Sequence, residues 1–390
     1  MGYRTSRSSS QVTSSTPKTD SDSHAGDHRS LSPLQLRAKR FRRLKRGYYS
    51  FVLLTSFYGL SFFLPLLMNH RAILVQYNGE FYFPALASCL HDTFGLGQER
   101  VYLANTFDQI SRSGQPVFGE ANYRELQRTF AEEGSGNFVI MPLIPYGPNE
   151  SFLDLPGAPP HPPSHLHWMG TDDRARDVMV RLTYGFRISI TFALLVTVVA
   201  YTIGIVVGAV LGYFGRWVDI VGQRFVEIWG NIPFLYTVII LASILGPSFG
   251  LLTAILAAFS WVSITYYLRG EFYREKSKDY VAAAVATGEG HLTIILRHIL
   301  PNALTPIITF APFAIVSLII SLVSLDFLGY GLPAPTPSWG ELLKQAKVNL
   351  RVWHLVVFPL GAMFVTLQLI VFIGEAVREA FDPKVQSRLR

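Results

Sequence analysis

The sequence predicts an all-α membrane protein with six transmembrane helices and a small extracytoplasmic insertion between the first two. Three observations lead to this fold class. Only 16% of the 390 residues are charged, whereas soluble domains carry about 25%. Long uncharged runs recur along the chain, and a helix needs roughly 20 apolar residues to cross a bilayer. Basic residues gather beside several of these runs, as they do at the cytoplasmic ends of membrane helices.

The uncharged runs predict the positions of the spans. They are 47–69, 188–214, 228–268, 302–325 and 352–374. The third run is about twice the length of one span, and its central GPSFG segment is typical of a turn that divides it in two. Buried helices of a soluble protein are the alternative, but so many uncharged runs would leave too little polar surface.

The placement of charge predicts the topology. Net charge is +7, and seven Lys and Arg residues stand in 37–46, directly before the first span. This cluster predicts a cytoplasmic N-terminus, and six spans return the C-terminus to the cytoplasm. Lys344, Lys347 and Arg351 fall on the predicted outer side, so the bias is not absolute. Beside a span, such a cluster indicates contact with anionic membrane lipid rather than with nucleic acid.

These observations divide the chain into five predicted parts. They are a disordered basic cytoplasmic tail (1–46), a first transmembrane helix (47–69), an extracytoplasmic loop or subdomain (70–186), a core of five transmembrane helices (187–377) with a cytoplasmic loop (270–301), and a cytoplasmic tail (378–390). The part before residue 37 is rich in Ser and Thr and has too few large apolar residues to offset the entropy of ordering.

The loop at 70–186 is too long for a bare connection. One helix is expected near 121–133, closed by Gly134, and a Pro-rich run covers 142–163. We therefore expect a small, irregular subdomain. Cys89 is the only cysteine in the chain, so no internal disulfide is possible.

Three histidines in the loop raise the question of a metal site. His161, His165 and His167 lie close together in the sequence HPPSHLHW. The prolines forbid a regular helix there, and no acidic residue or cysteine stands beside the histidines. The sequence therefore predicts no metal site.

The segment 170–177 is predicted to open a helix that leads into the second span. Thr171 or Asp172 is expected to cap it, since both suit a helix N-terminus. The neighbouring carboxylates of Asp172 and Asp173 would point in different directions on a helix. We therefore predict no catalytic pair here, and no catalytic residue elsewhere.

Three glycines in the second span indicate helix packing. Gly204, Gly208 and Gly212 recur every four residues and share one face of a helix. Small residues in such a row let two membrane helices approach closely.

Acidic residues within the spans are scarce and lie near their ends. Glu227, Asp326 and Glu375 can each reach a membrane interface. A proton-coupled carrier buries an acid near mid-membrane. The pattern therefore argues against a secondary transporter.

A short helix is expected within the cytoplasmic loop 270–301. It begins at Lys278 and Asp279, stays slim through its alanines, and reaches Gly288, and Pro301 marks the boundary with the next span. Its small surface suits insertion into a groove on a partner. An amphipathic helix resting on the inner leaflet is the alternative, but alanine and glycine bury little area in lipid.

The same stretch resembles the cytoplasmic signature of permease subunits in bacterial ABC importers. The signature is Glu-Ala-Ala, three residues, Gly, nine residues, Ile, one residue, Leu-Pro. Its residues in this chain are Ala283, Ala284, Gly288, Leu300 and Pro301. The chain departs from the signature where Ala282 replaces the glutamate and His298 the isoleucine. The lost glutamate puts one polar contact in doubt.

Further segments resemble the peptide and nickel branch of that family. They are 170–177 with 184–189, 297–302, 324–333, and 337–341, and 69–84 is similar to the subgroup of microcin C-type oligopeptide importers with an enlarged outer loop.

The resemblance implies a type I importer permease of the bacterial inner membrane that moves oligopeptides or peptide-like compounds. It also implies a second permease subunit, ATP-binding subunits that hold ATP and Mg, and an extracytoplasmic substrate-binding protein. The helix at 278–289 would couple to the ATPases through Asp279, Tyr280, Val281, Ala283, Ala284, Gly288, Leu300 and Pro301. The chain has no GxxxxGK[ST] phosphate loop, so no cofactor is expected on it.

Three other functions stay open at this point. A nickel or other small-solute importer would use the same scaffold. A membrane-anchored enzyme would need a catalytic cluster in 70–186, where none has useful spacing. A passive channel leaves the cytoplasmic signature unexplained. No residue is assigned to substrate contact.

Overall fold

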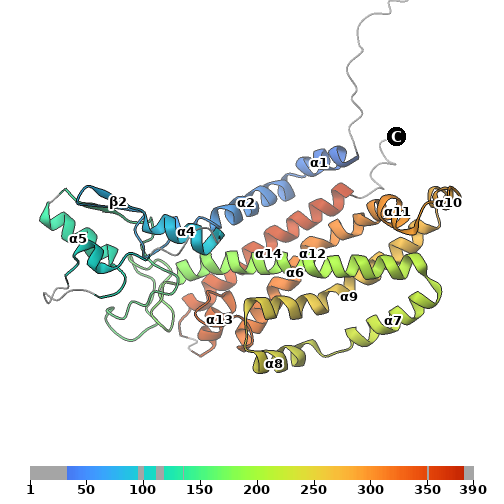
Figure 1. Cartoon of the computed structure of the whole chain (residues 1–390). Helices are drawn as coiled ribbons and strands as arrows, with labels where there is room; N and C mark the ends of the chain where they lie inside the picture. The colour runs from blue at the N-terminus through green and yellow to red at the C-terminus, as the bar shows by residue number, and fades with distance from the viewer. Residues whose placement is uncertain (1–32, 95–100, 111–117, 135, 349–350, 382–390) are drawn as a thin grey trace, which may run out of the picture.

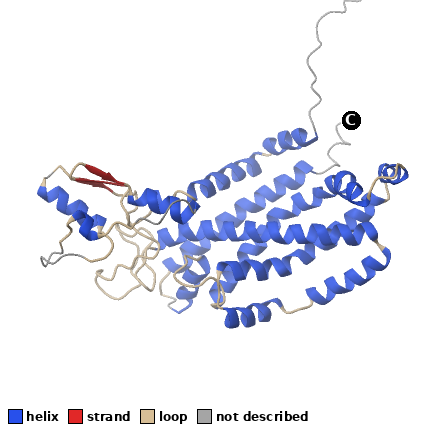
Figure 2. Ribbon diagram, viewed as in Figure 1, coloured by secondary structure: helices blue, strands red, loops and turns tan. Residues whose placement is uncertain are grey.

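The computed structural model describes residues 33–94, 101–110, 118–134, 136–348 and 351–381. Most of them form helices, which run side by side in an elongated bundle (Figures 1 and 2). The helices of the bundle are α1 (Pro33–Arg43), α2 (Lys45–Ser61), α3 (Leu64–Leu67), α6 (Val178–Phe214), α7 (Arg216–Gly230), α8 (Phe234–Leu245), α9 (Phe249–Lys276), α10 (Asp279–Ala286), α11 (His291–Thr293), η2 (Ile294–Ile299), α12 (Leu300–Leu328), α13 (Trp339–Val348) and α14 (His354–Phe381).

Four helices in the described part of the chain are long and apolar enough to cross a membrane. They are α6, α9, α14 and the continuous helix His291–Leu328, and α7 with α8 makes a fifth if this bent pair is one span. The predicted first span contains the 17-residue helix α2, a turn at Phe62–Phe63 and the short helix α3. The structure therefore supports four to five spans, with a shorter first helix than predicted.

The bend between α7 and α8 measures 69°. The uncharged run predicted the third span to begin at residue 228, whereas helix α7 begins at Arg216. Pro233 stands at the N-cap of α8, where its missing N–H group ends the hydrogen-bond ladder of the preceding helix. The segment expected to be one straight helix is therefore divided into two helices at a bend.

Pro301 falls in the first turn of α12, as expected of a boundary, but the helix does not break there. Helix runs from His291 through to Leu328, and the turn just before Pro301, Ile294–Ile299, is π-helical. A proline inside an α-helix clashes with the carbonyl four residues earlier. A π-turn changes that register and lets the helix continue.

The packing of α6 on α9 depends on glycine. A Cβ atom added to Gly204, Gly208 or Gly212 would lie closer than 3.0 Å to atoms of α9. The nearest side chains are those of Ile264, Leu268 and Phe272, and α9 backbone carbonyls lie beside each glycine as well. Any larger residue would therefore push the two helices apart.

The insertion is more regular than predicted, and it is not all-α. It holds β1 (Leu74–Tyr77), β2 (Glu80–Tyr82), α4 (Pro84–Phe94), η1 (Ala104–Phe107), α5 (Tyr123–Glu133) and β3 (Phe138–Ile140). The strands form an antiparallel sheet in the order β2-β1-β3. Asn78 and Gly79 both have positive φ, as the two-residue turn of such a hairpin requires. The predicted helix near 121–133 is confirmed as α5, which Gly134 closes.

The basic segment before the first span is helical rather than disordered. Residues 33–43 form α1, and the guanidinium of Arg37 lies 4.7 Å from the ring centroid of Phe381 in α14. Phe41 makes an edge contact with Phe51 of α2. These apolar contacts order the segment, because the basic side chains share the helix with aromatic and aliphatic ones. Residues 1–32 lie outside the described residues.

Candidate functional site

The short helix α10 stands at the end of the bundle opposite the insertion (Figure 1). One side of it is buried: Val281 and Ala284 are 2% and 5% exposed and join a core cluster with Leu268 and Phe272 of α9. The other side is open, and Val285 is 57% exposed. The helix therefore rests on the bundle by one face and presents the other.

The predicted coupling residues divide between these two faces. Val281 and Ala284 point inward and Leu300 is half-buried. The exposed members of the predicted set are Asp279, Tyr280, Ala283, Gly288 and Pro301. Three further exposed residues, Ala282, Val285 and Ala286, complete a small apolar surface on α10.

Glu275, which the sequence analysis missed, fastens α10 to α9. Its side chain is 3% exposed and lies 2.7 Å from Nζ of Lys278. The hydroxyl of Tyr280 donates to its other oxygen at 2.8 Å, and Nδ2 of Asn302 donates to that hydroxyl at 3.2 Å. Burial, followed by the hydrogen bond to Glu275, raises the pKa of Tyr280. A buried carboxylate with two donors fixes the angle of α10 to the bundle.

Gly288 ends α10 in a left-handed conformation, with φ of +77°. Its N–H donates to Val285 and the N–H of Glu289 donates to Ala284, at 3.0 and 3.2 Å. This pair of bonds is the Schellman motif, which favours glycine at this position. Glu289 then contacts His298 at 2.8 Å, so the turn is held at both ends.

Two contacts join this segment to the end of α6. The hydroxyl of Tyr213 lies 2.8 Å from Nδ1 of His291, and Nζ of Lys276 donates to the Tyr213 carbonyl. The ends of α6, α9 and the His291–Leu328 helix are thereby fastened into one unit. A force on α10 would reach all three long helices.

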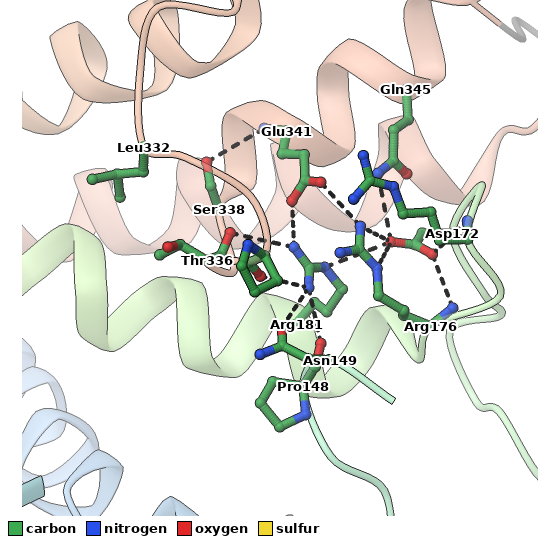
Figure 3. Close-up of polar contacts among 12 residues, drawn as sticks. Pro148, Asn149, Asp172, Arg176, Arg181, Leu332, Thr336, Ser338, Glu341 and Gln345 are labelled. Atoms are coloured by element: carbon green, nitrogen blue, oxygen red, sulfur yellow. Dashed lines mark hydrogen bonds and ion pairs between the residues drawn. The ribbon is translucent and has the colours of Figure 1, made fainter. Parts of the chain in front are cut away.

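The opposite end of the bundle carries a buried polar network (Figure 3). Arg181 and Asp172 are both fully buried. Arg181 pairs with Glu341 of α13, and Arg176 bridges Asp172 and Glu341 at 2.6 and 3.0 Å. Gln345 donates to Asp172 at 3.5 Å. Each buried charge therefore has an opposite partner, as burial requires.

The same network fastens two loops to α6. Arg181 donates to the carbonyls of Pro148, Pro335 and Thr336 at 2.8, 3.3 and 3.3 Å. Nε1 of Trp339 donates to the Leu182 carbonyl at 2.9 Å. The sequence analysis missed Arg181, although an arginine four residues into an apolar helix is a signal for a buried partner.

The α6 helix begins later than predicted. Its N-cap is Asp177, whose carboxylate accepts from the N–H of Val180 at 2.9 Å. Thr171 and Asp172 lie in a loop that pairs back on Asp177 through a β-bridge. Asp172 accepts bonds from Arg176 rather than capping a helix, because a buried arginine pair outweighs a cap.

His167 is bonded to Asp177 at 2.8 Å and packs in a three-ring cluster with Tyr146 and Phe152. His161 and His165 make no metal-binding group with it. Within the residues that the structure describes, no cluster of three His, Cys, Asp or Glu residues could hold a metal ion.

Comparison with known proteins identifies the family. Residues 200–387 match the family described as "Binding-protein-dependent transport system inner membrane component". The chain is 40% identical over 354 residues to the inner membrane ABC transporter permease protein YejE of Escherichia coli, covering 90% of this chain and 98% of that one. The chain belongs to the inner-membrane permeases of ABC transporters. The permease is therefore a multi-pass protein of the inner membrane.

Two further relatives have informative names. The permease is 38% identical to the peptidoglycan transport system permease protein YejE of Agrobacterium fabrum, covering 90% of this chain and 93% of that one. It is 36% identical to the oligopeptide transport system permease protein OppC of Haemophilus influenzae, covering 56% of this chain and 70% of that one. Family membership implies an ATPase and a substrate-binding partner, and the family is the transmembrane component rather than the ATPase.

Proposed function

We propose that the permease is one of two related permease subunits of an ATP-driven importer for peptides or peptide-like compounds. Two relatives named for oligopeptide and peptidoglycan transport support this cargo class. The 90% coverage of this chain by the first two relatives supports extending the assignment across the insertion as well as the core.

The exposed face of α10 is the proposed contact with an ATP-binding subunit. This proposal rests on one observation. α10 lies at one end of the bundle, with one face buried in the core and the opposite, exposed face made of small residues. Alanine side chains allow close approach of a partner groove, and Val285 adds an exposed apolar contact. ATP binding would move α10, and the bonds of Glu275 and Tyr213 would transmit that movement to the long helices.

The proposed topology has six spans, with α2 as the first and the bent pair α7 and α8 as the third. The ends of α1 and α14 lie at the α10 end of the bundle (Figure 1). Basic residues in α1 and the last turns of α9 support a cytoplasmic position for that end. The insertion at the other end would then face the outside.

Copurification tests this function. The tagged permease is extracted from native membranes in mild detergent, and its partners are identified by mass spectrometry. We expect a second permease subunit and an ATP-binding protein.

Ala283→Asp should lower the amount of copurified ATP-binding protein, because a buried, unpaired carboxylate would face an apolar groove.

A matched control separates docking from folding. Ala131 is also an exposed helical alanine, but it lies on α5 in the insertion. Ala131→Asp should leave the ratio of ATP-binding protein to permease unchanged. An unchanged ratio in Ala283→Asp as well would contradict the docking assignment.

A further inference from the structure

A hollow of about 310 Å³ lies between α6, α9 and α12. It is bordered by Thr197 of α6, Ser263 of α9 and Ser317 of α12. All three residues fall well inside their helices, far from either end. The hollow is therefore at the depth of the hydrocarbon core, where polar groups are costly unless they serve a function.

The lining of the hollow combines hydroxyl groups with apolar side chains and carries no charge. Hydroxyl groups come from all three helices, and no Asp, Glu, Lys, Arg or His is among the lining residues. The hydroxyls of Ser317 and Ser321 donate to carbonyls of their own helix at 3.1 and 2.9 Å, which leaves their oxygens free to accept. In the described part of the chain, the hydroxyls of Ser260 and Ser263 have no hydrogen-bond partner.

Aromatic rings complete the lining. The rings of Tyr267 and Phe310 are stacked with their centroids 4.4 Å apart, at the edge of the hollow. Both side chains are exposed in the isolated chain. Their faces offer a broad apolar contact for side chains of varied shape.

This surface differs from the rest of the exposed bundle. The exposed large residues of α14 are Val357, Leu360, Phe364 and Val365, which suit contact with lipid. The open face beside the hollow instead exposes Ser263, Ser317 and Ser324. Ser317 and Ser324 donate to carbonyls of their own helix, and their oxygens remain able to accept hydrogen bonds. Lipid chains offer no donors to these oxygens, so this face fits a polar occupant better.

We propose that this hollow is a binding site for the peptide main chain on the translocation path. The assignment rests on the proposed function and adds the residues that contact the cargo. Every peptide carries N–H donors and C=O acceptors in its main chain, and hydroxyl groups serve both. Because the lining holds no fixed charge, it accepts acidic and basic peptides alike.

Cysteine labelling tests whether water and cargo reach the hollow. The native Cys89 is replaced by Ser, and Ser317→Cys or Ser263→Cys is added in the assembled importer. A positively charged, water-soluble methanethiosulfonate should label both cysteines, and a saturating tripeptide should slow the labelling. Phe364→Cys, on the apolar side of α14, is the matched control and should stay unlabelled.

Charge substitution tests the contact with cargo. Ser317→Asp should favour uptake of a Lys-containing tripeptide over a Glu-containing one by about 25-fold, because one unit charge about 4 Å away in a wet site favours the first about fivefold and disfavours the second about fivefold. Ser317→Lys should reverse that preference. A structural role alone would lower the uptake of both tripeptides equally and leave their ratio unchanged.

The outcomes distinguish this inference from the proposed function. If the wild-type importer takes up no peptide, the cargo proposal fails whatever the labelling shows. If uptake is normal but both cysteines stay as unreactive as Phe364→Cys, lipid or a helix of the second permease covers the face, and the binding site is overturned.

Discussion

At the insertion end of the bundle, Arg181 and Asp172 are fully buried and paired, whereas at the other end Val285 of α10 stays 57% exposed. At the insertion end, the buried charged side chains find their partners within the chain. At the α10 end, the small apolar surface of α10 is exposed to solvent in the isolated chain. One end is complete as folded, and the other carries the surface that we propose for contact with an ATP-binding subunit.

The comparison explains where each end places its charges. Arg181 and Glu341 join α6 to α13 and hold loops that are far apart in the sequence. At the other end, the acid that fastens α10 is Glu275, whose partners lie within five residues of it, while the buried Asp219 joins α7 to α9 through Arg269. Long-range pairs hold the architecture together, whereas the short-range pairs of Glu275 set the angle of one small helix, the proposed contact with an ATP-binding subunit.

The largest effect is expected from Arg181→Met. Removing this guanidinium leaves Glu341 and Asp172 short of a partner, and breaking a buried ion pair costs about 3–5 kcal/mol. We expect a lower melting temperature of the purified importer, measured by intrinsic fluorescence. The bound ATPase should remain at its normal ratio until the protein unfolds, because α10 is at the other end.

Arg224→Met is the control for Arg181→Met. Arg224 also pairs with a glutamate, Glu227, but its side chain is 74% exposed. Such pairs contribute about 0–1 kcal/mol, so the melting temperature should hardly change. Equal losses in the two variants would mean that the insertion end is not locked by its buried network.

A smaller, local effect is expected from Glu275→Ala. Lys278 and the hydroxyl of Tyr280 lose their acceptor, and a hydrogen bond to a charged group contributes about 1.5–3 kcal/mol. Amide exchange in 279–286 should become about tenfold faster, as measured by hydrogen-exchange mass spectrometry. Exchange around Arg181 should not change, and Glu227→Ala should leave both regions as they are. Faster exchange across the whole bundle would show that the two ends are not separable.

The sequence predicted local features well where one residue type decides them. Gly134 closes α5, and the glycines 204, 208 and 212 face α9. In each case the physical cause is the lack of a side chain, which is visible in the sequence itself. The Asn78-Gly79 turn carried the same kind of signal for the β1–β2 hairpin, and the prediction of an all-α fold overlooked it.

Features that depend on distant partners were not predictable. Asp172 was expected to cap α6, but Arg176 and Arg181 recruit it into the buried network and Asp177 takes the cap. Pro301 was expected to separate the cytoplasmic loop from the next span, yet a π-turn before it keeps the helix continuous. The role of Glu275 could be recognised only from the structure, which places the hydroxyl of Tyr280 beside its carboxylate. The long-range fold decides such contacts.

Gly288→Val sharpens the comparison at the α10 end alone. The added side chain would meet nothing within 4 Å, so the cost comes from the left-handed backbone, about 1–2 kcal/mol for a residue with a Cβ. We expect the variant to insert normally and to lose most of its peptide uptake, because the turn that ends α10 is distorted.

Gly290→Val is the matched control for Gly288→Val. Gly290 is two residues away and equally open, but its φ is −71°, which any residue adopts. Uptake should stay near the wild-type rate. Full uptake in Gly288→Val would contradict a coupling role for this turn.

The smallest effect is expected from acid. It tests whether buried ion pairs stabilise the insertion as they stabilise the adjacent end of the bundle. Burial alone would raise the pKa of Glu120, but hydrogen bonds from His70 and Arg71 outweigh it and lower that pKa from 4.5 to about 2. The ionised carboxylate therefore stabilises the insertion above pH 4.5, and this contribution is lost as pH falls towards 2.

Amide hydrogen exchange in β1, corrected for its intrinsic rate, should accelerate in the wild type as pH falls over that interval. Glu120→Gln should exchange faster already at pH 6 and lose the acid dependence. If its profile still follows the wild type, the insertion is held by its aromatic core, and buried charge locks only the bundle beneath it.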